Sequence, residues 1–169
     1  VAKRVKRSEG PIFQILHEIH KLVTLIFTGR NVNFGNYSCL TKQDIITLSQ
    51  QESLWSSFSG TLKKTINRLN TINSTRGSRY FGPSKMSIFN LCIHSFSIIS
   101  VFKFQVFLRG FIFGISIYLF KNFLGIAAFF LIMALIIFLA LIHLSSLREN
   151  KEDFLKSEEN VDNVKTYTH

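Results

Sequence analysis

Twenty consecutive residues without a charged or strongly polar side chain, 123–142, constrain this chain more than any other feature. A helix rises about 1.5 Å per residue, so about 20 residues cross the roughly 30 Å hydrocarbon layer of a bilayer with their internal backbone groups hydrogen-bonded. A buried helix of a soluble protein rarely needs apolar residues on every face, and a signal peptide would lie at the N-terminus. The stretch therefore predicts a transmembrane helix with its core at 123–142.

A second apolar region precedes this stretch and contains three basic residues, Lys103, Arg109 and Lys121. An ionised side chain at the middle of a bilayer costs about 2.5–3.5 kcal/mol on insertion scales. We therefore expect these three residues at membrane edges, or inside the membrane where they face a protein partner or water. They are the candidate membrane-edge or intramembrane polar sites.

The membrane region, 86–147, is expected to cross the bilayer twice, and two registers satisfy the positions of the bases. In the first, a span over 87–108 is followed by a short interfacial connection and a second span over 123–145. In the second, 104–120 is a short span that forms a tight hairpin with 123–145, with Lys121 and Asn122 at the turn. Either register places a second span within 87–120 and leaves both chain termini on one side of the membrane.

The region before the membrane segment, 11–72, shows the pattern of amphipathic helices. A helix is predicted from Pro11 to about Thr28, because a proline favours the first helical turn and Gly29 ends the run. Its apolar residues fall on one broad face, which suits a helix in the membrane interface or a helix packed against protein.

A second helix is predicted from Thr41 to about Ile72, with Asp44 completing a weak capping box and Gly60 as a candidate interruption. Four apolar residues recur in it every seven positions, as in the seam of a coiled coil. Burial of this stripe within the chain is the alternative to binding a partner helix. The candidate partner-binding residues are Leu48, Trp55, Leu62 and Leu69.

Charge divides the remainder of the chain into three segments. The N-terminal segment 1–10 and the linker 73–85 are basic, and residues 1–85 carry thirteen Lys and Arg against four acids. The tail 148–169 alternates basic and acidic residues and is expected to be largely disordered. A basic flank beside a membrane segment favours contact with anionic lipids, whereas no nucleic-acid module is recognisable, so no specific nucleic-acid partner is expected.

Few residues have a spacing that supports chemistry. His17 and His20 lie three positions apart on a helix, one fewer than the spacing of zincin-type metal hydrolases, and no further ligands gather nearby in the sequence. Cys39 and Cys92 have no metal-binding spacing and are expected to be free thiols. No catalytic, cofactor or metal site is predicted, so an enzyme is not expected.

The sequence thus predicts an all-α membrane protein: amphipathic N-terminal helices followed by a two-helix transmembrane hairpin. The leading hypothesis is a non-enzymatic subunit or assembly factor of a membrane protein complex, with other membrane subunits as partners. Two alternatives are a membrane-anchored tethering or fusion-related protein that uses a coiled coil, and an oligomeric transport component. The basic start of the chain is compatible with the mitochondrial inner membrane, and the endoplasmic reticulum is the other membrane considered.

Overall fold

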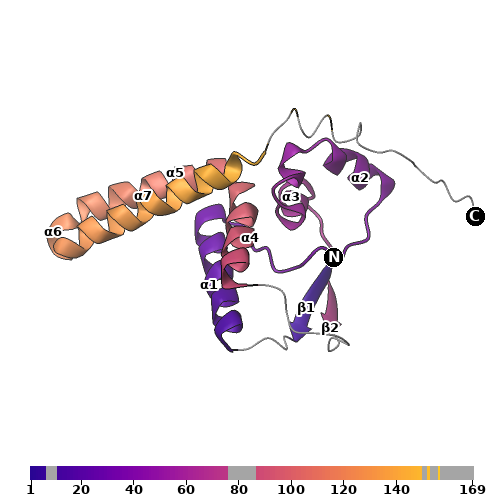
Figure 1. Ribbon diagram of the computed structural model, residues 1–169, viewed down its shortest axis with the longest axis horizontal. Coiled ribbons are helices and arrows are strands. Elements are labelled where there is room, and N and C mark those ends of the chain that lie inside the picture. The colour runs from indigo at the N-terminus through magenta and orange to yellow at the C-terminus, as the bar shows by residue number, and fades with distance from the viewer. Residues whose placement is uncertain (7–10, 76–86, 150–151, 153–155, 157–169) are drawn as a thin grey trace, which may run out of the picture.

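The computed structural model describes residues 1–6, 11–75, 87–149, 152 and 156. These residues are mostly helical, with seven α-helices, one short 3-10 helix and two strands (Figure 1). The helical class is therefore confirmed. The prediction of a purely α-helical chain is wrong in one detail, because the strands form a small sheet.

The first helix, α1, runs over Pro11–Thr28, as predicted. Gly29 follows it with a φ of 70°, a left-handed backbone conformation that glycine adopts without steric cost. The glycine thus ends the helix and turns the chain into an irregular segment that leads to Thr41.

The predicted helix from Thr41 to about Ile72 is replaced by three shorter elements, and the candidate interruption, Gly60, lies inside the third. They are α2 (Lys42–Ser49), the 3-10 helix η1 (Glu52–Leu54) and α3 (Phe58–Thr65). The start is confirmed, because the Thr41 and Asp44 side chains form a reciprocal capping box. Ser57 caps α3 through the amide of Gly60, so a second helix start interrupts the heptad pattern.

The two strands join distant parts of the chain. β1 (Ala2–Lys6) pairs in parallel with β2 (Ile72–Thr75), and Ala2 lies opposite Ile72. The Val1 ammonium also donates a hydrogen bond of 2.7 Å to the Asn70 carbonyl. The predicted basic segment and linker therefore meet at this sheet, while residues 7–10 and 76–85 lie outside the described part of the chain.

The predicted span over 87–108 is not one helix. It is divided between α4 (Ile88–Ser100) and α5 (Lys103–Leu119), which meet at an angle of 93°. The Ser97 and Ser100 hydroxyls donate to main-chain carbonyls of their own helix, an interaction that often bends helices. Val101 and Phe102, at the bend, are almost completely buried, so packing holds the two helices in this arrangement.

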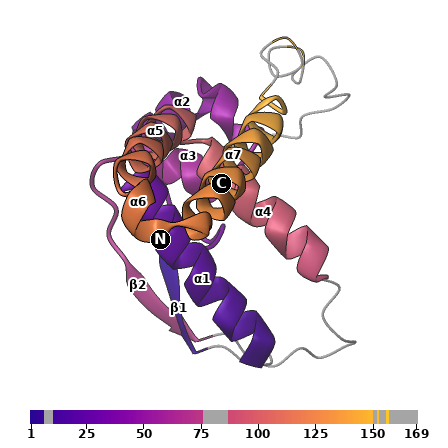
Figure 2. The ribbon, with the colours of Figure 1, turned by 90° about the vertical axis from the view of Figure 1, so that its left-hand side faces the viewer.

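The pairing of the helices instead resembles that of the second register. α5 is followed by the short helix α6 (Lys121–Leu124), which contains Lys121 and Asn122, and then by α7 (Ile126–Ser146). Helices α5 and α7 pack side by side as a hairpin that projects from the rest of the chain, with α6 at its tip (Figures 1 and 2). Gly125, at a φ of 56°, separates α6 from α7, so the long apolar helix begins three residues later than predicted.

The buried core lies at the base of this hairpin. It joins the α4–α5 bend to the last turns of α7 and to the segment after α1. Helices α1 and α4 lie crosswise to the hairpin, and both contact α5. The core residues are Val32, Ile98, Ile99, Val101, Phe102, Val106 and Ile142.

Most of the predicted charged tail, 148–169, lies outside the described residues. The structure describes Arg148 and Glu149, which follow α7, and two isolated positions further on.

Candidate functional site

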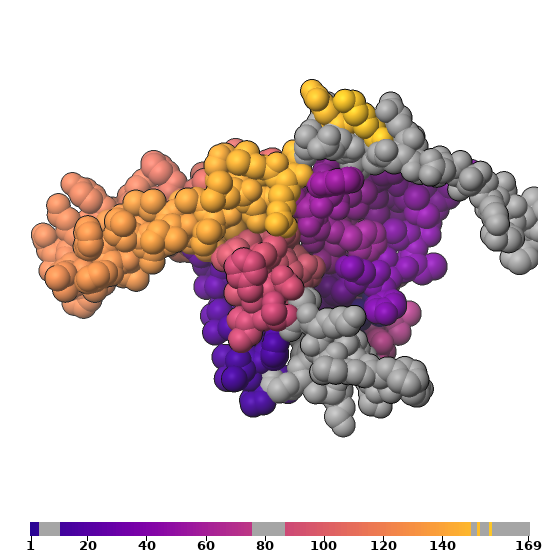
Figure 3. All heavy atoms as spheres, viewed as in Figure 1, coloured from indigo at the N-terminus to yellow at the C-terminus, as the bar shows by residue number. Residues whose placement is uncertain are grey.

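The surface of the hairpin is the candidate functional site, because large apolar side chains cover it. Phe123 is 89% exposed, Ile126 79% and Phe104 75%, values that are costly in water. Figure 3 shows the hairpin as an arm that projects from the rest of the chain. Further exposed apolar residues on the arm include Phe111, Ile112, Leu119, Phe120, Phe129, Phe130, Ile136, Ile137 and Leu144.

One described helix, α7, is long and apolar enough to cross a membrane. The bent pair α4 and α5 passes the same test only when the two helices are taken together. Only 11% of the most apolar part of α7 is buried inside the chain. The core helix of a soluble protein would be mostly buried, so α7 differs from such a helix in its surroundings.

Hydroxyl side chains, in contrast, occupy much of the interior around the hairpin base. Thr24, Thr28, Ser97 and Ser100 are each no more than 4% exposed. Their hydroxyls donate to carbonyls of their own helices, as in the 2.7 Å bond from Thr24 to His20, so burial leaves these donors satisfied. Buried hydroxyl side chains beside the apolar core, with large apolar residues exposed outside, are found where helices pack within lipid.

Two glycines of α5 face α7. A Cβ atom added at Gly110 would lie 2.8 Å from a methyl group of Leu139, which is too close, whereas one at Gly114 would lie 3.8 Å from Leu135, an ordinary contact. The Leu139 side chain therefore fits tightly against Gly110, while Gly114 leaves room for a methyl group. Phe27 of α1 also packs on the hairpin, with its ring centroid 5.4 Å from that of Phe113 and 4.5 Å from that of Phe138.

Arg109, a predicted membrane-edge or intramembrane residue, is bound to the end of α1. Its guanidinium donates a hydrogen bond of 2.7 Å to the Ile26 carbonyl and a longer one of 3.4 Å to the Leu25 carbonyl. The last carbonyls of a helix lack intrahelical partners and carry partial negative charge. Gly29 allows the approach, because a Cβ atom there would collide with the guanidinium.

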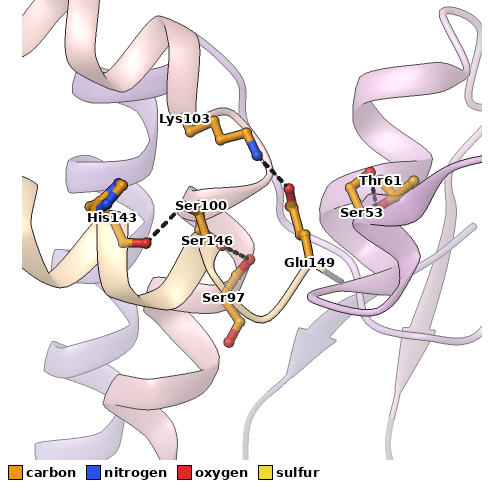
Figure 4. A network of polar contacts seen from close by, with 8 residues as sticks. All are labelled: Ser53, Thr61, Ser97, Ser100, Lys103, His143, Ser146 and Glu149. Carbon is orange, nitrogen blue, oxygen red and sulfur yellow. Dashed lines mark hydrogen bonds and ion pairs between the residues drawn. The ribbon is translucent and has the colours of Figure 1, made fainter. Parts of the chain in front are cut away.

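Lys103 lies at the base of the hairpin, in the first turn of α5. Its ammonium group pairs with the Glu149 carboxylate at 2.8 Å, which joins the start of α5 to the chain just after α7 (Figure 4). The Glu149 side chain is 8% exposed, and its second oxygen, Oε1, has no hydrogen-bond partner among the described residues. Sequence reasoning missed Glu149, because it placed this residue in the charged tail, where the charge pattern names no particular partner.

Lys121 lies at the opposite end, in the first turn of α6 at the tip. Its ammonium group is 4.5 Å from the centroid of the Tyr118 ring, a cation–π arrangement. The three predicted bases are thus brought to three levels of one hairpin: the base, an intermediate level and the tip. The structure does not bring them together as one site.

The four predicted partner-binding residues do not form one exposed stripe. Leu48 is 3% exposed and Leu62 is fully buried, so these two pack within the chain. Trp55 is 55% exposed, and Leu69 is half-buried beyond the end of α3. Burial within the chain, the alternative that the sequence left open, therefore holds for Leu48 and Leu62.

The histidines and cysteines occupy separate positions. The rings of His17 and His20 lie 6.2 Å apart on α1, and within the described ranges no three His, Cys, Asp or Glu side chains gather as a metal site would require. Cys39 and Cys92 are exposed free thiols, as predicted.

Comparison of the chain with protein-family models, curated proteins and solved structures found no match.

Proposed function

We propose that the protein is a non-enzymatic integral membrane subunit or assembly factor, in which the α5–α7 hairpin crosses the bilayer. The distribution of polarity carries the proposal. Phenylalanine, isoleucine and leucine side chains cover the arm, whereas buried serine and threonine side chains lie beside the apolar core at its base. In hydrocarbon the exposed side chains lose no hydrophobic free energy, and buried small residues allow the helices to pack closely.

The length of the hairpin supports two crossings. At about 1.5 Å per residue, the seventeen residues of α5 extend about 26 Å and the twenty-one of α7 about 32 Å. The hydrocarbon layer is about 30 Å thick. Lys103 and Lys121 then lie at opposite membrane edges, where long basic side chains reach water or lipid headgroups.

A role within a complex is favoured over catalysis because the three basic side chains of the hairpin already have structural partners. Arg109 binds α1, Lys103 pairs with Glu149, and Lys121 lies over Tyr118. The lipid-facing surface is large for so short a chain, and other membrane helices are the natural partners for part of it. Anionic lipids are the proposed partners of the basic residues that precede the hairpin.

A pair of matched substitutions tests the membrane assignment. Ile136 in α7 and Ile45 in α2 are 55% and 53% exposed, so in a water-soluble protein lysine is equally tolerated at both. In a bilayer, Ile136→Lys places a charge at mid-membrane at a cost of about 2.5–3.5 kcal/mol, whereas Ile45→Lys remains in water. We expect Ile136→Lys alone to reduce the alkali-resistant membrane fraction. Equal behaviour of the two variants contradicts the proposal.

Mild detergent extraction tests the assembly role. The native protein is expected to migrate in a complex larger than the 19.4 kDa chain in its own micelle. Chemical crosslinking before extraction should give the same larger species. Migration as a free monomer in both experiments contradicts a role as a subunit or assembly factor, while leaving the membrane assignment intact.

A further inference from the structure

Helix α1 carries an apolar face that the described chain leaves exposed, unlike a typical helix on a water-soluble protein. Five of its apolar side chains recur at intervals of three and four and are between 40% and 62% exposed, while Thr24 and Thr28 on the packed side are almost completely buried. An amphipathic helix normally turns its apolar face inward. The exposed apolar face consists of Ile12, Ile15, Ile19, Leu22 and Ile26.

The position of α1 in the fold indicates what contacts its exposed apolar face. In Figure 1, α1 lies crosswise to the hairpin and on the side of α4 from which the hairpin projects. Phe27, in the last turn of α1, packs against Phe113 and Phe138 of the hairpin, so the two apolar surfaces adjoin. Whatever solvent surrounds the hairpin near its base also reaches α1.

The position along α5 at which α1 is attached agrees with a helix that lies in the membrane interface. Arg109 holds the end of α1 six residues beyond Lys103, which corresponds to about 9 Å along α5. Helices in the plane of a membrane bury their apolar face about 5–10 Å into the boundary between headgroups and acyl chains. With Lys103 at the near membrane edge, α1 lies at this depth.

We propose that α1 is an in-plane helix of the near leaflet, with the Ile12–Ile26 face in contact with lipid acyl chains. This inference rests on the proposed function, because it takes the position of the hairpin in the bilayer as its reference. The Arg109 guanidinium links α1 to the hairpin and supplies a hydrogen-bond donor to the Ile26 carbonyl, whereas the Leu25 carbonyl also accepts from the Gly29 amide at 2.8 Å. The depth of the in-plane helix is thereby tied to that of the hairpin.

A second copy of the chain is the competing occupant, because the same five residues have the spacing of a coiled-coil seam. Lipid is favoured, because the apolar surface continues from α1 onto the hairpin, where a two-helix seam would end.

Depth-dependent fluorescence quenching tests the inference. Trp55 is the single tryptophan, so Trp55→Phe provides a background for Ile19→Trp in α1 and, separately, Ile136→Trp in α7. Each protein is reconstituted in phosphatidylcholine and phosphatidylglycerol vesicles whose acyl chains are brominated near the headgroup or near the chain end. The unsubstituted protein is the water-side control, because its Trp55 directly follows η1, away from the hairpin, and is 55% exposed.

We expect shallow bromines to quench Ile19→Trp about twofold more than deep bromines, and the reverse order for Ile136→Trp. Trp55 should be quenched by neither. Quenching of Ile136→Trp without quenching of Ile19→Trp overturns the in-plane helix and leaves the proposed function standing. Absence of quenching at both positions overturns the membrane assignment itself.

The alternative occupant has its own readout. With Cys39 and Cys92 replaced by serine, Ile19→Cys should give no disulfide-linked dimer under copper-catalysed oxidation in vesicles. Efficient dimer formation at Ile19→Cys identifies a second copy as the occupant and overturns the lipid contact.

Discussion

The Arg109 guanidinium in α5 donates a hydrogen bond of 2.7 Å to the Ile26 carbonyl in the last turn of α1. The two residues are 83 positions apart in the sequence, so this contact joins the first helix to the hairpin. A basic group at a helix C-terminus satisfies free carbonyls and interacts favourably with the helix dipole. A residue expected at a membrane edge or facing a partner thus has a partner within its own chain.

Replacement of Arg109 should loosen α1 from the hairpin. Arg109→Leu removes both hydrogen bonds and the favourable charge, and we expect the free energy of unfolding in detergent to fall by about 1–2 kcal/mol. Arg109→Lys keeps the charge and should recover part of this loss. Equal stability of Arg109→Leu and the unsubstituted protein, measured by circular dichroism during denaturant titration, would falsify the structural role.

The close approach of α5 and α7 predicts a difference between two glycines of one helix. Gly110→Ala forces the Leu139 side chain to shift, and we expect this variant to be less stable than Gly114→Ala by about 1 kcal/mol. Gly114→Ala meets only an ordinary contact with Leu135, so higher helix propensity should leave its stability unchanged or raised by up to about 1 kcal/mol. Thermal unfolding in one detergent compares the two variants. The same change in unfolding temperature for both would contradict a tighter contact at Gly110 than at Gly114.

The ion pair at the hairpin base predicts an asymmetry between its partners. Lys103→Met leaves the nearly buried Glu149 carboxylate without its cation, whereas Glu149→Gln removes the charge and leaves a half-exposed lysine in water. We expect a loss of about 1–2 kcal/mol for Lys103→Met and less for Glu149→Gln. The double variant should recover much of the Lys103→Met loss in denaturant titrations. A larger loss for Glu149→Gln than for Lys103→Met would contradict this assignment.

The burial of the heptad residues predicts different consequences for Leu62 and Trp55. Leu62→Ala empties a fully buried position and should cost about 2–5 kcal/mol of stability. Trp55→Ala removes a side chain that is 55% exposed and should cost much less. Denaturant titration of both variants measures this. A coiled-coil tether would instead show similar losses of partner capture at both positions with stability retained.

Local signals predicted several elements closely. Pro11 and Gly29 mark the ends of α1, and Thr41 with Asp44 marks the start of α2, because capping depends on residues only a few positions apart. The uninterrupted apolar run likewise predicted α7, although Gly125 moved its start. Length and composition suffice for such a helix.

Sequence patterns did not predict the contacts between residues that are distant in the sequence. The pairing of Ala2 with Ile72 depends on a long chain closure, and neither strand has a strong alternating pattern. The bend between α4 and α5 occurs without proline or glycine, where packing of Val101 and Phe102 decides the geometry. For the candidate site, the three bases were identified from charge alone, but their partners Ile26, Glu149 and Tyr118 required the fold.

The central claim, that the hairpin crosses a membrane, is tested most directly at its tip. Asn122→Cys is introduced in a protein whose Cys92 is serine, and Cys39 remains as the exposed reference thiol. Sealed vesicles are treated from either side with a membrane-impermeant thiol reagent. We predict that Asn122→Cys reacts from the side opposite to that from which Cys39 reacts. Reaction of both thiols from the same side contradicts a hairpin that spans the bilayer.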